Sequence, residues 1–326
     1  MNQSAIAKKY RQKNPDYSTL KLARIMYDDH PLLFNGVEGA RSALRYIEGK
    51  RGDKDRKKVQ GSPFVMEKER PKNPYNLPKS EEADYTPYRV TCKKAAILCD
   101  IHAPYHNEEA LTAAIKWLRK EKVDTVIING DLFDFHGMSR YMKDPRKKNF
   151  AYELDSGAAI IKILQKQLSA RIVYKLGNHD ERYQHFLWMK AGEIADVEDF
   201  QLKNLLIKRG CEIEIVEDKR IIQVGGLNVV HGHEFPSGIA SPVNIARGFY
   251  LRGKTSVIGG HHHRTSEHTE QDMNGKITTA WSVGCLSELH PQYMPINSWN
   301  HGAAMVEVDG EDFQVHNKRI YKGRIL

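Results

Sequence analysis

Five short groups of acidic, histidine and asparagine residues stand out in the C-terminal two-thirds of the chain. They read "DIH" at 100–102, "GDLFD" at 130–134, "GNHD" at 177–180, "HGH" at 231–233 and "GGHHH" at 259–263. In the last group, His261 and His263 are separated by one residue, so an extended chain would place both rings on the same side. Two imidazoles on one side form half of a site for a divalent metal ion.

Each group follows an apolar segment that reads as a β-strand. Taken singly, each has a structural explanation, because an aspartate after a strand often caps a helix and an Asn-His pair often fixes a turn. Five groups in order are harder to explain in this way, since the active sites of open α/β sheets form in loops at the carboxyl ends of strands. The donors are carboxylate, imidazole and amide oxygen without a thiolate, a set that suits Mn, Fe or Zn.

The elements that would hold these groups alternate between strand and helix in the first half of this region. Buried strands are predicted at 95–100, 124–130 and 171–178, and amphipathic patterns predict helices at 108–121 and 153–169. This alternation indicates βαβ units and a largely parallel sheet. After residue 210 the apolar segments shorten and turns multiply, which predicts a second, mixed sheet built from the later strands.

The net charge of +9 is concentrated at one end of the chain. Residues 1–94 hold 21 Lys and Arg against 12 Asp and Glu, whereas residues 95–326 hold 29 of each. A basic segment beside a neutral domain suggests an anionic partner, with nucleic acid as the leading candidate. The alternative is a basic arm that only aids solubility.

The basic segment contains two predicted helices, at 18–29 and 37–49, joined by a turn with glycine. Arg41 and Arg45 project from the second helix, and this pattern is typical of a helix-turn-helix. The alternative is a helical appendage packed on the main domain. The sequence thus predicts a basic helical domain at 1–52, a linker rich in charge and proline at 53–93, and a catalytic domain at 94–326.

Two features bear on the compartment. The chain has no run of 18 apolar residues and its first residues lack the apolar stretch of a secretory signal, so we expect no membrane span. The four cysteines form no CxxC pair, which favours reduced thiols in a cytoplasm over a disulfide framework.

The five groups together resemble the signature of the calcineurin-like metallophosphoesterases, over about residues 95–265. More loosely, the whole chain looks like phosphoesterases encoded by phages and bacteria, which implies the host cytoplasm if the chain is phage-encoded. The resemblance implies an α/β fold, a four-layer α/β/β/α sandwich of two mixed sheets, here preceded by the small helical domain. It also implies two divalent metal ions, with Mn expected and Fe or Zn as alternatives.

Carried over residue by residue, the resemblance implies the roles of nine side chains. One metal would be held by Asp100, His102 and His263, the other by Asn178, His231 and His261, with Asp131 bridging the two. His179 would protonate the leaving oxygen or hold the phosphate, and Asp134 would orient its imidazole. His262 would point away, although a register in which it is the ligand stays open, and His233 would support a ligand. Three arginines near these loops are candidates for phosphate binding or for surface salt bridges: Arg140, Arg182 and Arg264.

The expected function is metal-dependent hydrolysis of phosphoester bonds by direct attack of water, with nucleic acid as the expected substrate of a nuclease or DNA-end phosphatase. One alternative is a phosphatase for phosphoproteins or small metabolites. Another is a DNA-binding or virion-associated protein with a vestigial site, against which the complete ligand set argues. The sequence leaves the oligomeric state open.

Overall fold

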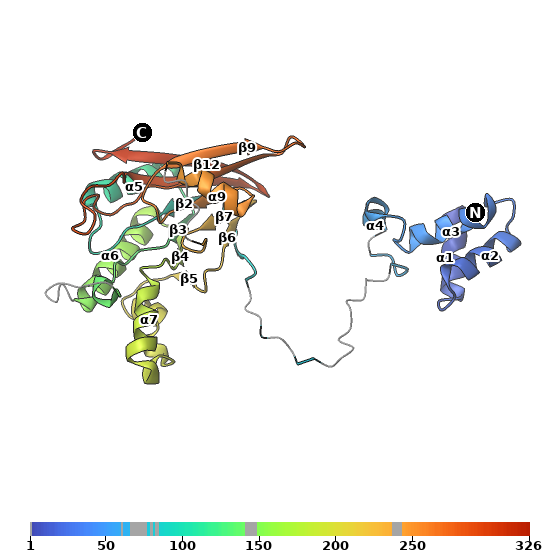
Figure 1. Cartoon of the computed structure of the whole chain (residues 1–326), viewed down its shortest axis with the longest axis horizontal. Helices are drawn as coiled ribbons and strands as arrows, with labels where there is room; N and C mark the ends of the chain where they lie inside the picture. Colours follow the sequence, from blue (N-terminus) through green and yellow to red (C-terminus); the bar gives the residue numbers. More distant parts are fainter. Residues whose placement is uncertain are drawn as a thin grey trace. The chain divides into compact units, whose positions relative to one another are not determined.

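The structure is a computed structural model that describes residues 2–59, 61–65, 77–78, 81, 85–140, 149–236 and 243–326. The chain divides into two compact units, Met1–Glu82 and Ala83–Leu326. Figure 1 labels the helices and strands along the chain. Among the described residues, no helix has both the length and the apolar character needed to cross a bilayer.

The N-terminal unit is built on three helices that share one small core. Its helices are α1 (Gln3–Lys13), α2 (Thr19–Asp29), α3 (Gly36–Ile47) and the short α4 (Asp53–Lys58). Helix α2 begins as predicted at the N-cap Ser18, whose side chain accepts the backbone N–H of Lys21. Helix α1 was not predicted, because within it only Ile6 and Ala7 are buried, too few apolar positions for a visible period.

The second unit contains a seven-stranded sheet in the order β13-β12-β11-β2-β3-β4-β5. Its strands are β2 (Lys94–Leu98), β3 (Thr125–Asn129), β4 (Arg171–Lys175), β5 (Glu214–Val216), β11 (His301–Asp309), β12 (Asp312–Tyr321) and β13 (Arg324–Ile325). Strands β2 to β5 run parallel, whereas β11, β12 and β13 pair antiparallel at one side, so the sheet is mixed.

A six-stranded sheet follows the order β1-β6-β7-β8-β10-β9 and is also mixed. Its strands are β1 (Tyr88–Val90), β6 (Ile222–Val224), β7 (Leu227–Val230), β8 (Val257–Gly259), β9 (Ser266–Gln271) and β10 (Ile277–Ser282). The helices of this unit are α5 (Glu108–Glu121), α6 (Phe150–Leu168), α7 (Glu181–Lys190), α8 (Leu202–Ile207) and α9 (Ile245–Gly253). A 3₁₀ turn, η1 (His136–Met138), precedes α6.

Alternation along the strands separates three cores and so creates four layers. Leu98 and Ile128 face α5 and α6 on one side of the seven-stranded sheet. Ile97 and Ile127, one residue earlier in each strand, face the six-stranded sheet instead. Helix α9 covers the outer face of that second sheet through Phe249 and its neighbours. The fold is therefore the α/β/β/α sandwich of two mixed sheets that was expected.

Two expectations about the chain's organisation need correction. Strands after residue 210 do not all form the second sheet, because β5, β11, β12 and β13 extend the first one. In addition, the predicted linker at 53–93 contains α4 and β1, and β1 pairs in parallel with β6. The compact unit accordingly begins near residue 83 and not at 94. Other parts of the predicted linker, including residues 66–76, lie outside the described residues.

Candidate active site

The loops that carry the predicted ligands turn sharply as soon as their strands end. Asp100, His102, Asp131, His261 and His263 all adopt left-handed backbone conformations, with φ between 51° and 67°. Non-glycine residues are uncommon there, and such conformations persist where the surrounding structure enforces them, often at functional sites. The turns bring the ends of β2, β3 and β8 to one place, so residues distant in sequence become neighbours.

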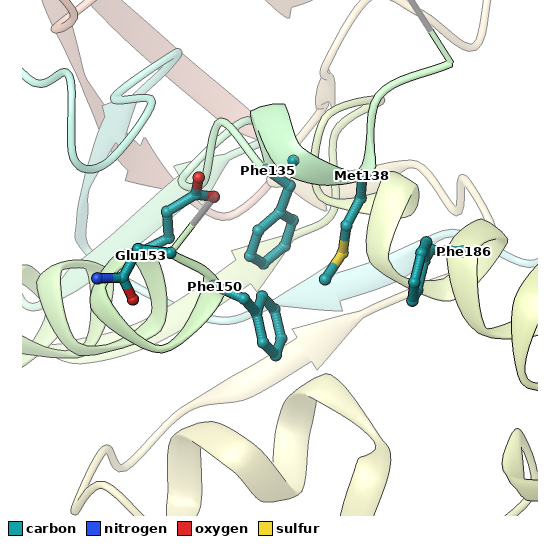
Figure 2. Close-up of a pocket in the computed structure, with 7 residues that line it drawn as sticks. Phe135, Met138, Phe150, Glu153 and Phe186 are labelled. Carbon is teal, nitrogen blue, oxygen red and sulfur yellow. The ribbon is translucent and has the colours of Figure 1, made fainter. Parts of the chain in front are cut away.

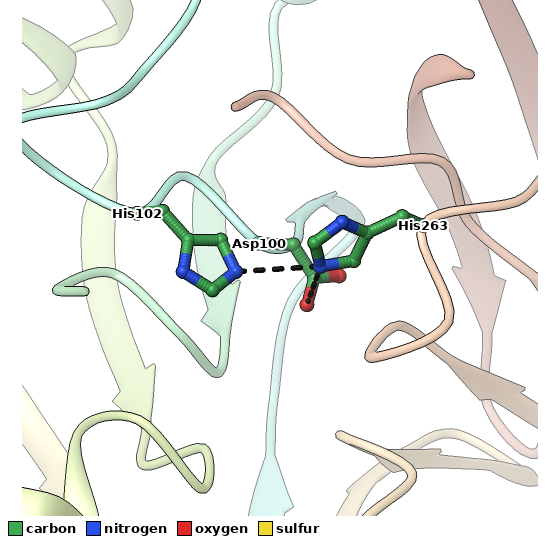
Figure 3. Close-up of side chains that lie close together, drawn as sticks. All are labelled: Asp100, His102 and His263. Atoms are coloured by element: carbon green, nitrogen blue, oxygen red, sulfur yellow. Dashed lines mark hydrogen bonds and ion pairs between the residues drawn. The ribbon is translucent and has the colours of Figure 1, made fainter. Parts of the chain in front are cut away.

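The first group of candidate ligands contains Asp100, His102 and His263, all of which are buried (Figure 3). The Nε2 atoms of His102 and His263 lie 3.3 Å apart, and His263 Nε2 lies 3.3 Å from Asp100 Oδ1. Their donor atoms are within 4.8 Å of one another, as a single ion requires. This is the set that the sequence assigned to one metal.

The second group contains Asp131, His231 and His261, whose donor atoms also lie within 4.8 Å of one another. The Oδ1 atom of Asn178 is 3.2 Å from His231 Nε2, which brings the predicted amide ligand to the same place. Asp131 Oδ2 lies 3.3 Å from His231 Nε2 and 3.7 Å from His102 Nε2. One carboxylate oxygen thus stands between the two groups, the position needed for a bridge.

The charges of this donor set fit divalent cations. Asp100 and Asp131 are both buried, with 0% and 1% exposure, and a buried charge is costly unless it is paired. Burial lowers the pKa of His231, but the charge of Asp131 outweighs it and raises that pKa to about 10. Asp100 acts in the same way on His263, whose pKa also rises to about 10. Carboxylates that favour a positive charge on these imidazoles would also stabilise divalent cations at the same place, with the histidines bound in their neutral form.

His261 differs from these two histidines. Burial and the neighbouring His231 charge lower its pKa to about 3, so its ring is neutral, the form that ligates metals. His262, between the two candidate ligands, packs its ring 5.7 Å from that of Phe249 and belongs to none of the candidate metal groups found among the described residues. This geometry places His261 and His263 in the two sites and turns His262 toward the α9 layer.

His179 and Asp134 lie at the edge of the first group. His179 Nδ1 is 3.1 Å from both the carboxylate Oδ1 and the backbone oxygen of Asp134, and Asp134 Oδ1 also lies 3.2 Å from His102 Nδ1. Arg182 donates to the Asp134 backbone oxygen at 2.7 Å and to His179 Nε2 at 2.9 Å. Since a guanidinium can only donate, Nε2 accepts and Nδ1 carries the hydrogen that faces Asp134.

This arrangement makes Arg182 part of the site, although the sequence left it open between phosphate binding and a surface salt bridge. Its position three residues after His179, in the first turn of α7, was the available signal. A donor atom of His179 also lies within 4.8 Å of donors of His102 and Asp131. His179 therefore lies beside candidate ligands of both metal sites.

Two further carboxylates were not given roles from the sequence. Asp180 accepts backbone N–H groups from Asp131 at 2.8 Å, Phe133 at 3.1 Å and Gly177 at 2.8 Å, and so ties the loop after β3 to the loop after β4. Glu234 accepts the backbone N–H groups of His231 and Gly232 and pairs with the fully buried Lys175 at 2.9 Å.

His233 is held at the side of the second group. Its Nε2 atom lies 3.1 Å from Glu181 Oε1, and its ring is 5.2 Å from that of His231. Its contacts are therefore with a carboxylate and with a candidate ligand, as expected for a supporting residue.

Comparison with known families decides the wider classification. Residues 93–265 match the calcineurin-like phosphoesterase family, and this segment spans more than half of the chain and all five residue groups. The chain belongs to the calcineurin-like phosphoesterase family. As a member it is a hydrolase of phosphoester bonds with a dinuclear divalent metal site, and the resemblance inferred from the sequence is confirmed.

Relatives add little about the substrate. The Gene 54 protein of Mycobacterium phage L5 is 27% identical over 245 residues, covering 71% of this chain and 95% of its own. Vacuolar protein sorting 29 from Cryptosporidium parvum is 11% identical, with a TM-score of 0.42 over 73% of this chain and 96% of its own. A dimetal phosphatase from Danio rerio is 12% identical, with a TM-score of 0.39 over 72% of this chain and 97% of its own.

Proposed function

We propose that this phosphoesterase acts on nucleic acid, as a nuclease or as a phosphatase of DNA ends, and that its two metal ions are Mn²⁺. Its relative in Mycobacterium phage L5 is a phage protein, so the proposed place of action is the cytoplasm of a host cell. The observation that carries the nucleic-acid part is the basic, independently packed helical unit that precedes the catalytic unit.

Several basic side chains of that unit lie on exposed faces of its helices. Residues 1–82 hold 18 Lys and Arg against 11 Asp and Glu. Lys8, Lys9, Lys21 and Arg24 are exposed on α1 and α2, while α3 is packed through Leu44 and presents Arg45 outward. A compact helical unit with basic outer faces matches the electrostatic requirement of binding a phosphate backbone.

The catalytic groups support hydrolysis by direct attack of water. Metal ions bound to the two groups would lower the pKa of water to near neutrality and offset charge on the phosphoryl oxygens. Asp131 would hold both sites at a short separation, and the left-handed loops would fix the direction of each ligand. Arg182 would bind a phosphoryl oxygen, which would release Nε2 of His179. His179, held through its Nδ1–H by Asp134, would then hold a second proton on Nε2 next to the leaving oxygen.

Four substrates separate this proposal from its alternatives when assayed with Mn²⁺ and with EDTA. They are end-labelled DNA, bis-p-nitrophenyl phosphate, p-nitrophenyl phosphate and a phosphoserine peptide, with His179→Ala as the inactive control. We expect Mn²⁺-dependent cleavage or dephosphorylation of DNA that His179→Ala abolishes. Turnover of the monoester or the peptide, with DNA left untouched under the same conditions, would contradict the nucleic-acid proposal and favour a phosphatase.

Salt dependence tests the helical unit directly. Arg41→Ala combined with Arg45→Ala removes two positive charges spaced by four residues on α3. The matched control, Lys116→Ala combined with Lys120→Ala, removes two exposed charges with the same spacing on α5. We expect the slope of log K against log salt for DNA binding to fall by about 2 in the first pair and to stay unchanged in the second. Equal slopes in both pairs would exclude α3 from the DNA-binding surface.

A further inference from the structure

A cavity of about 280 Å³ has three phenylalanine rings in its walls, one of them from Phe135, the residue after Asp134 (Figure 2). It is formed around η1, the start of α6 and the second turn of α7, with Phe135, Met138, Phe150, Glu153 and Phe186 among its lining residues. The catalytic mechanism uses none of these side chains. We therefore consider which ligand these side chains could bind.

The rings that line the cavity are backed by other rings and are fixed in place. Phe135 stacks on Phe133 with centroids 4.7 Å apart, and Phe150 stacks on Tyr183 at 5.0 Å. Phe135 and Phe150 themselves meet at 5.6 Å. Phe186 contributes a separate ring from α7, on the other side of Met138 in Figure 2. Such walls suit a flat aromatic group, which can stack without ordering flexible side chains.

Two polar side chains interrupt the apolar lining. One is Asn149, whose side-chain oxygen accepts the backbone N–H of Tyr152 at the start of α6, and the other is Glu153. Glu153 is only 4% exposed, its carboxylate accepts the backbone N–H of Phe135, and its Oε2 atom has no hydrogen-bond partner among the described residues. A buried carboxylate oxygen without a hydrogen-bond partner costs folding free energy, so it indicates a ligand that donates a hydrogen bond to it. Burial, reinforced by the charge of Asp134, raises the pKa of Glu153 to about 7, so near neutral pH it can accept or donate a hydrogen bond.

The cavity is joined to the catalytic site through a single peptide group. The carbonyl of Asp134 receives hydrogen bonds from Arg182, and His179 Nδ1 lies 3.1 Å from it. The N–H on the other side of the same peptide belongs to Phe135 and is bound by Glu153. A group bound to Glu153 would thus lie one peptide group away from the residues proposed to act on the leaving oxygen.

We infer that this cavity is a base-binding subsite, in which a nucleobase of the substrate stacks on the phenylalanine rings and hydrogen-bonds to Glu153. The inference rests on the proposed action on nucleic acid and goes beyond it, because it makes the enzyme read a base next to the phosphate that it hydrolyses. Enzymes that read an unstacked base use the same combination of aromatic walls and polar edge contacts.

Other occupants satisfy the cavity less well. A hydrocarbon chain would leave Glu153 Oε2 buried without a partner. The ring of a phosphotyrosine carries no N–H donor, and phosphoserine has no ring to stack. A nucleobase offers a planar π-face together with N–H donors and acceptors on one edge, which meets both features at once.

Binding to the full-length, Mn²⁺-loaded protein tests the inference without requiring turnover. In a His179→Ala background, which prevents hydrolysis, isothermal titration would compare nucleoside 5′- and 3′-monophosphates with ribose 5-phosphate. We expect at least one mononucleotide to bind more than tenfold tighter than the sugar phosphate. Phe186→Ala should weaken mononucleotide binding about 5- to 150-fold, the range covered by stacking on one base, and leave ribose 5-phosphate unaffected.

Two further variants sharpen the result. Glu153→Gln keeps the volume of the side chain but fixes a donor at one position, so the order of preference among the four bases should change. Tyr152→Ala, an exposed neighbour on the same helix, is the matched control and should change neither ligand. Equal affinities of sugar phosphate and mononucleotides, or a preference that survives both cavity variants, would overturn the inference. So would phenyl phosphate binding as tightly as the best mononucleotide.

The outcome is separable from that of the proposed function. A mononucleotide preference that depends on Phe186, in a protein that leaves DNA untouched, would support the subsite and reject nucleic acid as the substrate. Cleavage of DNA together with equal binding of mononucleotides and ribose 5-phosphate would reject the subsite alone.

Discussion

Asp180 offers the sharpest test of how the site is held together. Its buried carboxylate accepts three backbone N–H groups, from Asp131, Phe133 and Gly177. These groups belong to the two loops that carry the proposed bridging carboxylate and the proposed amide ligand. If this side chain is the link between the loops, its removal should destabilise the catalytic unit and weaken metal binding together.

The size of the effect follows from the number of donors left without partners. Asp180→Ala would leave three buried N–H groups unpaired, at about 1–3 kcal/mol each, which gives an upper range of about 3–9 kcal/mol before relaxation or water entry. Asp180→Asn keeps an oxygen that can accept two of the three donors, so about 1–3 kcal/mol should be lost. Burial and the charge of Asp131 raise the pKa of Asp180 to about 7, so the neutral amide also relieves an electrostatic cost.

The chain provides a convenient readout for the relevant unit. All four tryptophans lie at positions 117, 188, 281 and 299, within the catalytic unit. Urea unfolding followed by tryptophan fluorescence therefore reports on that unit and not on the helical unit. Asp196→Ala, which removes an exposed carboxylate nearby in sequence, is the control and should change stability by less than about 0.5 kcal/mol.

Metal binding provides the second half of the test. Mn²⁺ affinity measured by titration should fall at least tenfold in Asp180→Ala and less in Asp180→Asn, because supporting residues around a metal site commonly account for 10- to 100-fold in affinity. An Asp180→Ala protein that unfolds within about 1 kcal/mol of the wild type, or that binds Mn²⁺ with unchanged affinity, would refute the reasoning that this carboxylate joins the loops.

Two further predictions concern the second ligand group. Gly130→Ala should lower Mn²⁺ affinity at least tenfold, because a Cβ atom there would meet His231 Nδ1 at 2.1 Å, whereas Gly210→Ala, with a similar positive φ but open space around it, should leave affinity unchanged in the same titration. Burial raises the pKa of Glu234, but the charge of Lys175 outweighs it and lowers the pKa to about 2. Its folded-state pKa is thus below the unfolded value. Above pH 4.5, Glu234→Gln should therefore lower the free energy of unfolding by about 3 kcal/mol, and this loss should shrink as the pH falls from 4.5 toward 2. Urea titrations across this range measure the loss, and a loss that stays constant would contradict the prediction.

The sequence was informative where local pattern and final structure coincide. Helix α5 begins and ends at the predicted residues, because its apolar period, the N-cap Asn107 and acidic residues in its first turn agree. The buried strands β2, β3 and β4 were legible as apolar runs followed by ligand residues. In each case the information lies within a few consecutive residues.

The sequence of a single strand did not show to which of the two sheets the later strands belong. The apolar pattern of β11 is compatible with either sheet, and its place beside β2 depends on pairing between residues about 200 positions apart. Strand β1 was hidden for the same reason, since three residues with one buried side chain give no period. For such strands, pairing with residues distant in the sequence determines both their formation and the sheet to which they belong.

In the site, too, some residues could be identified from local sequence patterns and others only from the tertiary structure. Nine predicted ligand and catalytic residues could be named because their types and spacing form a family pattern, but the residues that position them could not. Asp180 and Glu234 accept hydrogen bonds from backbone N–H groups. Nearly every residue type has such a group, so these contacts cannot be recognised from the sequence. Nothing in the sequence distinguishes Phe186 from the other aromatic residues of α7. Its role in the cavity depends on residues of η1 and α6, which also line it.

The peptide group between Asp134 and Phe135 makes the catalytic and cavity residues parts of one mechanical unit. Phe135 itself has a left-handed backbone conformation, with φ of 43°. Its N–H is bound by Glu153, and the preceding carbonyl accepts a hydrogen bond from Arg182. Hydrogen bonds on both sides of a peptide restrict its rotation, so a ligand that draws Glu153 away would free the group that orients His179. If the proposed base-binding subsite is occupied, a base that keeps the contact between Glu153 and the Phe135 N–H would also keep this peptide fixed beside His179.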